Sequence, residues 1–198
     1  MNNLSPNMKR PEGFLRHPEP KAIGHPGRGR AILAGELVLR GHILRGNPFA
    51  ISDLPLLVRA DLHGFGWLDD LAALASPEAR AMSQKLVLDW QYDHPDPAEA
   101  TVEWLAEIAG RRLLRWLFHA GMILPGLRQP DADAFLHACR GHLSWLSDTW
   151  STTPDGLPRI EALTALVFAA FHLHGHDQLA RLALVTLAEE AEAMGPDP

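Results

Sequence analysis

The sequence predicts an all-α fold built from antiparallel helical hairpins, and two observations support this prediction. Apolar residues recur with the 3.6-residue period of a helix face from Leu62 almost to the end of the chain. Proline, glycine and aspartate divide this region into segments of helical length with short connections between them. Successive helices joined in this way pack against one another, so we expect a layered helical array such as a solenoid or a toroid.

The composition limits the classes of function. The chain has 198 residues, of which 46% are hydrophobic and 21% charged, and this suits one globular domain. Its net charge of −6 argues against a nucleic-acid partner, because affinity for phosphate backbones comes from an excess of lysine and arginine. Basic residues gather before residue 46, where we expect a solvated arm, with an anion-binding strip as the alternative. They are Lys9, Arg10, Arg16, Lys21, Arg28, Arg30, Arg40 and Arg45.

The single cysteine and the N-terminus bear on the cellular compartment. Cys139 has no second cysteine to pair with, so an intramolecular disulfide and a cysteine-based zinc site are both excluded. Met1–Gly13 is polar and lacks the apolar stretch of a secretory signal, and no later segment is apolar over the length that spans a bilayer. We therefore expect a cytoplasmic protein with no membrane partner.

The first part of the chain divides into two regions. Residues 1–30 hold five prolines and four glycines, a density that breaks helices and strands, so an extended N-terminal arm is predicted there. Residues 31–51 carry short apolar runs separated by Gly35, Gly41 and Gly46, which predict a small β-hairpin. The helical domain is expected to cover residues 31–198.

Six helices are expected in the periodic region. The second of them opens with Ser76 as its N-cap and Pro77 as its first residue, and it runs past Trp90. The others are expected near residues 65–74, 100–117, 131–150, 160–171 and 178–193. Because such an array buries helix faces between neighbours, a terminal helix presents an apolar face to a partner.

Three stretches resemble the N-terminal helical domain of heparinase II/III-like polysaccharide lyases. The first is LHGFGWL at Leu62–Leu68. The second joins Glu103 and Trp104 to GRRLLRWL at Gly110–Leu117, and the third joins DGLPR at Asp155–Arg159 to ALVFAA at Ala165–Ala170. Their order and spacing match the family, and the resemblance extends over most of the chain after the arm.

The resemblance implies a fold and a substrate class. Members of this family have an incomplete α/α toroid followed by β-sandwich domains, and they cleave uronic-acid-containing polysaccharides by β-elimination. That reaction needs donors that neutralise the substrate carboxylate and a base such as tyrosine or histidine. Leu157 and Pro158 stand where the lyases carry an Asn/His motif, and the segment with the catalytic tyrosine and a later histidine would lie beyond Pro198. Tyr92 is not expected to replace them, so we expect no catalytic residue and a role in binding an acidic polysaccharide or oligosaccharide.

Arg111, Arg112 and Arg115, with Trp104 and Trp116, are the main candidates for binding a sugar acid. An arginine fork pairs with a carboxylate through two hydrogen bonds, and an aromatic ring provides a platform for the apolar face of a sugar. Trp67 and His63 form a second pair of candidates at a helix start. The alternative is that Trp116 belongs to the core and that Arg112 ties helices together through backbone carbonyls.

Other patterns carry weaker signals. His172, His174 and His176 alternate in sequence, and residues two apart point about 200° away from each other on a helix. We expect helix-terminal histidines there, with a metal site as the alternative. No phosphate-binding loop or Ser/His/Asp arrangement is recognisable, and no cofactor is expected. The competing functional hypothesis is a noncatalytic interaction or scaffold module that self-associates or docks on a partner chain.

Overall fold

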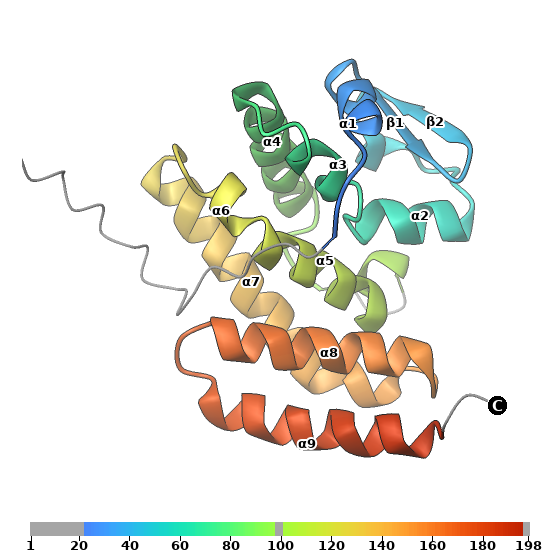
Figure 1. Ribbon diagram of the computed structural model, residues 1–198, viewed down its shortest axis with the longest axis vertical. Helices are drawn as coiled ribbons and strands as arrows, with labels where there is room; N and C mark the ends of the chain where they lie inside the picture. Colours follow the sequence, from blue (N-terminus) through green and yellow to red (C-terminus); the bar gives the residue numbers. More distant parts are fainter. Residues whose placement is uncertain (1–21, 98–100, 196–198) are drawn as a thin grey trace, which may run out of the picture.

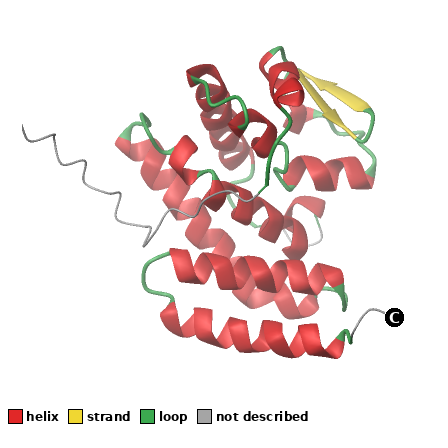
Figure 2. Ribbon diagram, in the orientation of Figure 1, coloured by secondary structure: helices red, strands yellow, loops and turns green. Residues whose placement is uncertain are grey.

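The computed structural model describes residues 22–97 and 101–195, and within these ranges the protein is helical apart from one two-stranded sheet (Figures 1 and 2). This confirms the predicted all-α class with a small hairpin. The elements in chain order are α1 (Pro26–Leu33), β1 (Glu36–Leu39), β2 (His42–Arg45), η1 (Pro48–Ala50), α2 (Leu56–His63), α3 (Leu68–Ala72), α4 (Pro77–Asp93), η2 (Val102–Trp104), α5 (Ala106–Phe118), α6 (Ala120–Ile123), α7 (Gln129–Thr149), η3 (Trp150–Thr152), α8 (Leu157–His172) and α9 (Asp177–Ala193).

The predicted extended arm is wrong at its C-terminal end, where residues 26–30 are part of α1. Pro26 stands in the first turn, where its missing N–H costs nothing, and Nδ1 of His25 accepts a hydrogen bond from the Gly27 N–H at 3.1 Å. Glycines oppose a helix, but here they allow close packing: a Cβ at Gly29 would lie 2.2 Å from the carbonyl oxygen of Asp70 in α3. Residues 1–21 of the predicted arm lie outside the described residues.

The predicted hairpin is formed by β1 and β2 in antiparallel register. Arg40 and Gly41 at its turn both have positive φ, 47° and 83°, which suits the twist of a two-residue hairpin loop. Leu37 and Leu44 lie opposite each other and are buried against the helices. The hairpin thus forms a small sheet that covers one end of the helical domain (Figure 2).

The helix predicted near residues 65–74 is the short helix α3, and a further helix, α2, precedes it. α3 ends earlier than expected, and α2 begins directly after Pro55, where no helix was predicted. Val58 and Leu62, four residues apart, form the buried face of α2. This apolar pair could have indicated the helix from the sequence, but it is a short pattern. Phe65, whose φ is 59°, separates the two helices.

The later helices are confirmed with shifted bounds. The Ser76 hydroxyl caps α4 as predicted and accepts a hydrogen bond from the Ala79 N–H at 3.2 Å. α5 begins at Ala106 and not near residue 100, because the 3-10 turn η2 precedes it. α7, α8 and α9 each match a predicted helix to within a few residues.

α5 is the central helix of the fold. It packs against α7 and α8, and α8 packs in turn against α9, so that the last two helices lie side by side in Figure 1. Gly110 permits the close approach of α5 to α8, because a Cβ there would lie 3.0 Å from the Cβ of Ala165. Trp90, Trp116 and Arg112 are among the largest fully buried side chains. Closure of these layers into a toroid stays a prediction.

Candidate functional site

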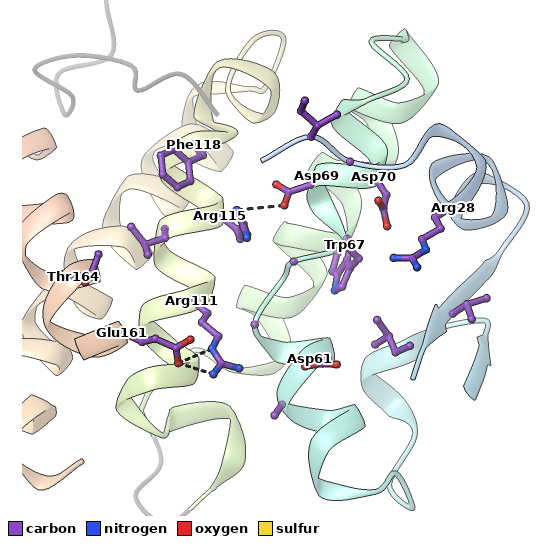
Figure 3. A pocket seen from close by; sticks show the side chains of 18 of the residues that line it. Arg28, Asp61, Trp67, Asp69, Asp70, Arg111, Arg115, Phe118, Glu161 and Thr164 are labelled. Atoms are coloured by element: carbon purple, nitrogen blue, oxygen red, sulfur yellow. Dashed lines mark hydrogen bonds and ion pairs between the residues drawn. The ribbon is translucent and has the colours of Figure 1, made fainter. Parts of the chain in front are cut away.

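A cleft of about 720 Å³ lies beside α5, and five other elements form the rest of its walls (Figure 3). Its walls come from α1 and the residues before it, β1, α2, the α2–α3 connection with α3, and α8. The charged lining residues are Arg28, Asp61, Asp69, Asp70, Arg111, Arg115 and Glu161, and the lining also includes Trp67, Leu114 and Phe118. We call this site the α5 cleft.

One face of α5 supplies the longest wall of the α5 cleft. Arg111, Leu114, Arg115 and Phe118 are spaced three, one and three residues apart, which places all four on the same side of a helix. The side chains of Arg111 and Arg115 are 39% and 30% exposed, so both guanidinium groups can meet a ligand. Gly64 lies next to Arg111: a Cβ there would be in ordinary van der Waals contact with the arginine side chain, 3.6 Å from its Cβ and Cδ.

Each of these arginines already has a carboxylate partner. Nε and Nη2 of Arg111 both donate to Oε2 of Glu161, with an Nε–Oε2 distance of 3.0 Å. Nη1 of Arg115 lies 3.3 Å from Oδ2 of Asp69, whose other oxygen is 2.7 Å from Nε2 of His119. These pairs hold the guanidinium groups in place but use only part of the five N–H donors that each arginine has.

Two charges of the α5 cleft are less constrained. Arg28 and Asp70 make no ion pair with any other described residue, whereas Asp61 pairs with Arg40 at 2.7 Å. Asp70 is held by a hydrogen bond to its Oδ1 from the backbone N–H of His25, at 2.7 Å. Both groups are available to a ligand.

Arg112 does not reach the α5 cleft, which corrects its predicted role in binding a sugar acid. Its side chain is 0% exposed. Nη1 donates to the carbonyl oxygens of His63, at 3.0 Å, and Glu103, at 2.9 Å, while Nε donates to Nε2 of His142 at 2.8 Å. The alternative is therefore confirmed: Arg112 ties α5 to α2, η2 and α7 through backbone carbonyls and an imidazole.

Aromatic rings complete the surroundings of Arg112. Its Cζ lies 3.9 Å from the centroid of the Trp90 ring and 5.0 Å from that of Trp104, distances at which the ring faces stabilise a cation. Trp104 and Trp116 are buried in this core, so the prediction that they form a platform for a sugar is wrong. For Trp116 the alternative, a place in the core, is confirmed. Trp67 is also buried, but its indole borders the α5 cleft. His63 is buried beside Arg112 and does not line the cleft.

Hydrogen-bond directions assign the imidazoles of His63 and His142 as neutral. Nδ1 of His63 accepts from the indole N–H of Trp90 at 2.9 Å, so its proton is on Nε2, which lies 3.3 Å from Oε1 of Glu103. Nε2 of His142 accepts from Arg112, so its Nδ1–H donates to the Ala138 carbonyl at 2.8 Å.

The protonation of this cluster follows from burial and charge. Burial lowers the pKa of His63 to about 3, although the Glu103 carboxylate opposes the shift. Burial, and then the charge of Arg112, lower the pKa of His142 well below its usual range. Burial alone would raise the pKa of Glu103, but the hydrogen bonds to its carboxylate, first that from Arg59, together with the charge of Arg59 and the interaction with His63 outweigh burial, and the net pKa is lowered. The cluster is a fixed network with one carboxylate and two arginines.

The sequence missed the acidic half of the α5 cleft. Asp69, Asp70 and Glu161 were not predicted, and Arg28 was placed in a basic arm, with an anion-binding strip as the alternative. Arg111, Arg112 and Arg115 were predicted together as binding residues, and the structure brings Arg111 and Arg115, four residues apart, to one face of α5 in the cleft wall. No local pattern indicates their partners, because Glu161 is 50 residues from Arg111.

The remaining predicted features lie outside the α5 cleft. His172 ends α8, as expected for a helix-terminal histidine, and its ring stacks on Phe168 with centroids 4.2 Å apart. Within residues 22–97 and 101–195, no group of three or more His, Cys, Asp or Glu side chains is arranged to hold a metal ion. None of the helices in these ranges has the length and apolar character needed to cross a bilayer.

Comparison with known proteins gives one partial likeness. The chain matches no family model and no solved structure. It is 34% identical over 88 residues to FtsZ-localized protein C of Caulobacter vibrioides. The match covers 42% of this chain and 15% of that protein, so the chain corresponds to a small part of its relative.

Proposed function

We propose that the α5 cleft binds a carboxylate-bearing oligosaccharide without cleaving it. The observation that carries the proposal is the position of Arg111 and Arg115, one helical turn apart, in the wall of a cleft of about 720 Å³. Clefts of this size accommodate small ligands, and a few convergent polar groups then set the orientation of the ligand.

In the proposed binding step, the carboxylate of the ligand takes the place of the Glu161 carboxylate as the partner of Arg111 on α5. Both donors of Arg111 converge on one oxygen of Glu161, an arrangement that uses only one oxygen of the carboxylate. A ligand carboxylate can meet a guanidinium group through two parallel hydrogen bonds, which is the stronger geometry. The apolar side chains of Leu114 and Phe118, with the indole of Trp67, offer surface to the ring faces of the sugar.

The residues around the cleft support binding over cleavage. β-Elimination needs a base near the substrate carbon, and tyrosine and histidine serve as such bases. Among the described residues that line the α5 cleft, the ionisable side chains are arginine, aspartate and glutamate. The buried His63 is held by Trp90 and Glu103, outside this lining.

Calorimetric titration of the protein tests the proposal. We expect a hyaluronan tetrasaccharide, which carries glucuronate, to bind, and maltotetraose, a neutral chain of the same length, not to bind. Arg115→Gln should weaken the binding about tenfold or more, because a charge-assisted hydrogen bond is lost. Arg128→Gln, on the surface of the segment before α7, is the matched control and should leave affinity unchanged.

Two outcomes would contradict the proposal. Equal affinity for the neutral chain, or no effect of Arg115→Gln, would show that the arginines do not recognise a carboxylate. An increase in ultraviolet absorbance from an unsaturated uronate product would show cleavage and would overturn the noncatalytic role.

A second candidate function, an interaction module, is favoured by the partial likeness to FtsZ-localized protein C. The outer face of α9 has exposed apolar side chains, with Leu182 66% and Val185 56% exposed. Co-pelleting with polymerised FtsZ of Caulobacter vibrioides tests this candidate. Binding that Val185→Glu abolishes and Glu189→Gln retains would support docking through α9, and absence of the protein from the pellet would reject it.

A further inference from the structure

Two charged residues that line the α5 cleft, Arg28 and Asp70, form no ion pair with another described residue, and their charges have opposite signs. Arg28 and Asp70 both line the α5 cleft, and both also line a smaller adjoining cavity of about 250 Å³ between α1, β1 and α3. They are therefore neighbours at the same end of the cleft, yet they lie outside the distance of an ion pair. Figure 3 shows both side chains on the side of the cleft opposite α5.

The backbone around Arg28 and Asp70 is held closely. A Cβ at Gly24 would lie 1.9 Å from the carbonyl oxygen of Asp69, and the Asp70 carboxylate accepts the His25 N–H at 2.7 Å. The segment before α1 is thus packed directly on α3, which restrains the two charged residues relative to each other. Oδ1 of Asp70 accepts this hydrogen bond, and its second oxygen has no hydrogen bond to another described residue.

The sign of the lining charge disfavours a highly anionic chain. Three arginines and four carboxylates line the α5 cleft, so the lining carries a formal charge of −1. A polysulfated ligand would meet carboxylates on several sides, and like charges repel at these separations. A ligand that carries both signs can instead pair with the arginines and with Asp70.

We propose that the ligand of the α5 cleft is a zwitterionic oligosaccharide, in which a uronate adjoins an amino sugar with a free ammonium group. The uronate pairs with the arginines, and the ammonium donates to the Asp70 carboxylate, a charge-assisted hydrogen bond. This inference rests on the proposed function and adds the second charged group that the cleft recognises.

The test compares two ligands that differ only at the amino group. One is the hyaluronan tetrasaccharide, with N-acetylated amino sugars, and the other is the same tetrasaccharide after N-deacetylation, titrated at a pH below the pKa of its amines. We expect the deacetylated form to bind about tenfold or more tightly, in line with a hydrogen bond between charged groups. Asp70→Asn should abolish this preference: it should weaken binding of the deacetylated form and, because it removes a negative charge from the lining, should not weaken binding of the acetylated form.

Asp70→Asn is suited to the test because the amide oxygen can still accept the His25 N–H and keep the segment before α1 in place. Asp133→Asn, at an exposed site on α7, is the matched control and should retain the preference. Arg115→Gln should weaken both ligands to the same extent.

The outcomes separate this inference from the proposed function. Equal affinity of the wild-type protein for both tetrasaccharides, or a preference that persists in Asp70→Asn, would overturn the inference and leave carboxylate binding intact. Failure of both tetrasaccharides to bind would overturn the proposed function and the inference with it.

Discussion

Arg112 connects segments that are far apart in the sequence. Its guanidinium group joins α5 to carbonyl oxygens of His63 and Glu103 and to the imidazole of His142. Removing a cation from water is costly, and the hydrogen bonds together with the face of the Trp90 ring offset that cost. Because these contacts are directional, Arg112 sets the relative positions of three elements.

Arg112→Lys should destabilise the protein strongly. Lysine keeps the charge but has no planar fork, so it cannot donate to the two carbonyl oxygens and His142 at once. We expect the free energy of unfolding to fall by about 2–4 kcal/mol, since buried acceptors lose their donors. Urea denaturation measures this change. Arg128→Lys, on an exposed side chain, serves as control, and an equal midpoint for both variants would contradict the role of Arg112.

The buried histidines predict a dependence of stability on pH. The pKa of His63 is about 3 in the folded protein, below the ordinary value of 6.5. Between these values the unfolded chain binds a proton that the folded chain does not bind. The free energy of unfolding should therefore be retained above about pH 6.5 and should decrease as the pH falls toward 3. His142, whose pKa burial also lowers, acts in the same direction.

Denaturation midpoints measured across this pH range check the prediction. His63→Gln removes one titrating group and should make the decrease shallower than in the wild-type protein. His137→Gln, on the exposed side of α7, is the control and should leave the slope unchanged. A stability that is constant from neutral pH to pH 4 would show that neither His63 nor His142 resists protonation.

At the scale of elements, α1 shows how packing overrides local preference. Glycines in this segment oppose a helix in isolation, and propensity is a weak prior that tertiary contacts often outweigh. Here the absence of side chains at Gly24 and Gly29 lets the backbone lie against the carbonyl oxygens of Asp69 and Asp70. The same glycines that predict an extended arm thus allow a helix to dock on α3.

Gly24→Ala should disturb this contact and the α5 cleft together. The added Cβ would lie 1.9 Å from the carbonyl oxygen of Asp69, so the backbone must shift. We expect a loss of about 1–3 kcal/mol in the free energy of unfolding, as for other overpacked sites. Thermal denaturation gives this value. Gly66→Ala, where no atom lies within 4 Å of the new Cβ, is the matched control from the same cleft.

Other elements differ in how well their local sequence predicts them. α4 was predicted from Ser76 and Pro77, and its N-cap is formed by side-chain chemistry within one turn. α2 was missed because it has only eight residues and ends at a Phe65 turn with positive φ. A helix of two turns repeats its apolar face too few times to establish a period.

The stability of the whole molecule should be uneven. In α5, eight residues are buried, including Arg112, Leu113, Trp116 and Leu117, whereas in α9 only Ala180 and Ala183 are buried. Amide hydrogens of α9 should therefore exchange with solvent faster than those of α5, because local opening of α9 exposes little apolar surface. Hydrogen–deuterium exchange with mass spectrometry measures this difference. Equal protection of the two helices would indicate that α9 is held by contacts beyond its buried alanines.

The sequence by itself determined the helical class, the hairpin and most helix positions, and it singled out Arg111, Arg112 and Arg115 together, of which Arg111 and Arg115 share one face of α5. These properties depend on residues within a few positions of one another, where the 3.6-residue period, glycine at turns and capping side chains act directly. Only the tertiary structure decided that Arg112 is buried in the core and that the carboxylates of Asp61, Asp69, Asp70 and Glu161 line the cleft.

The physical reason lies in the geometry of α5. Arg111 and Arg112 are neighbours in sequence, but successive helix residues point about 100° apart, so one faces the cleft and the other faces the core. The side of α5 that faces the core is set by its packing against α7 and α8. Glu161 reaches Arg111 from α8, which lies close to α5 at Gly110. Contacts across such sequence separations leave no local pattern, so only the folded chain shows which arginines can meet a ligand.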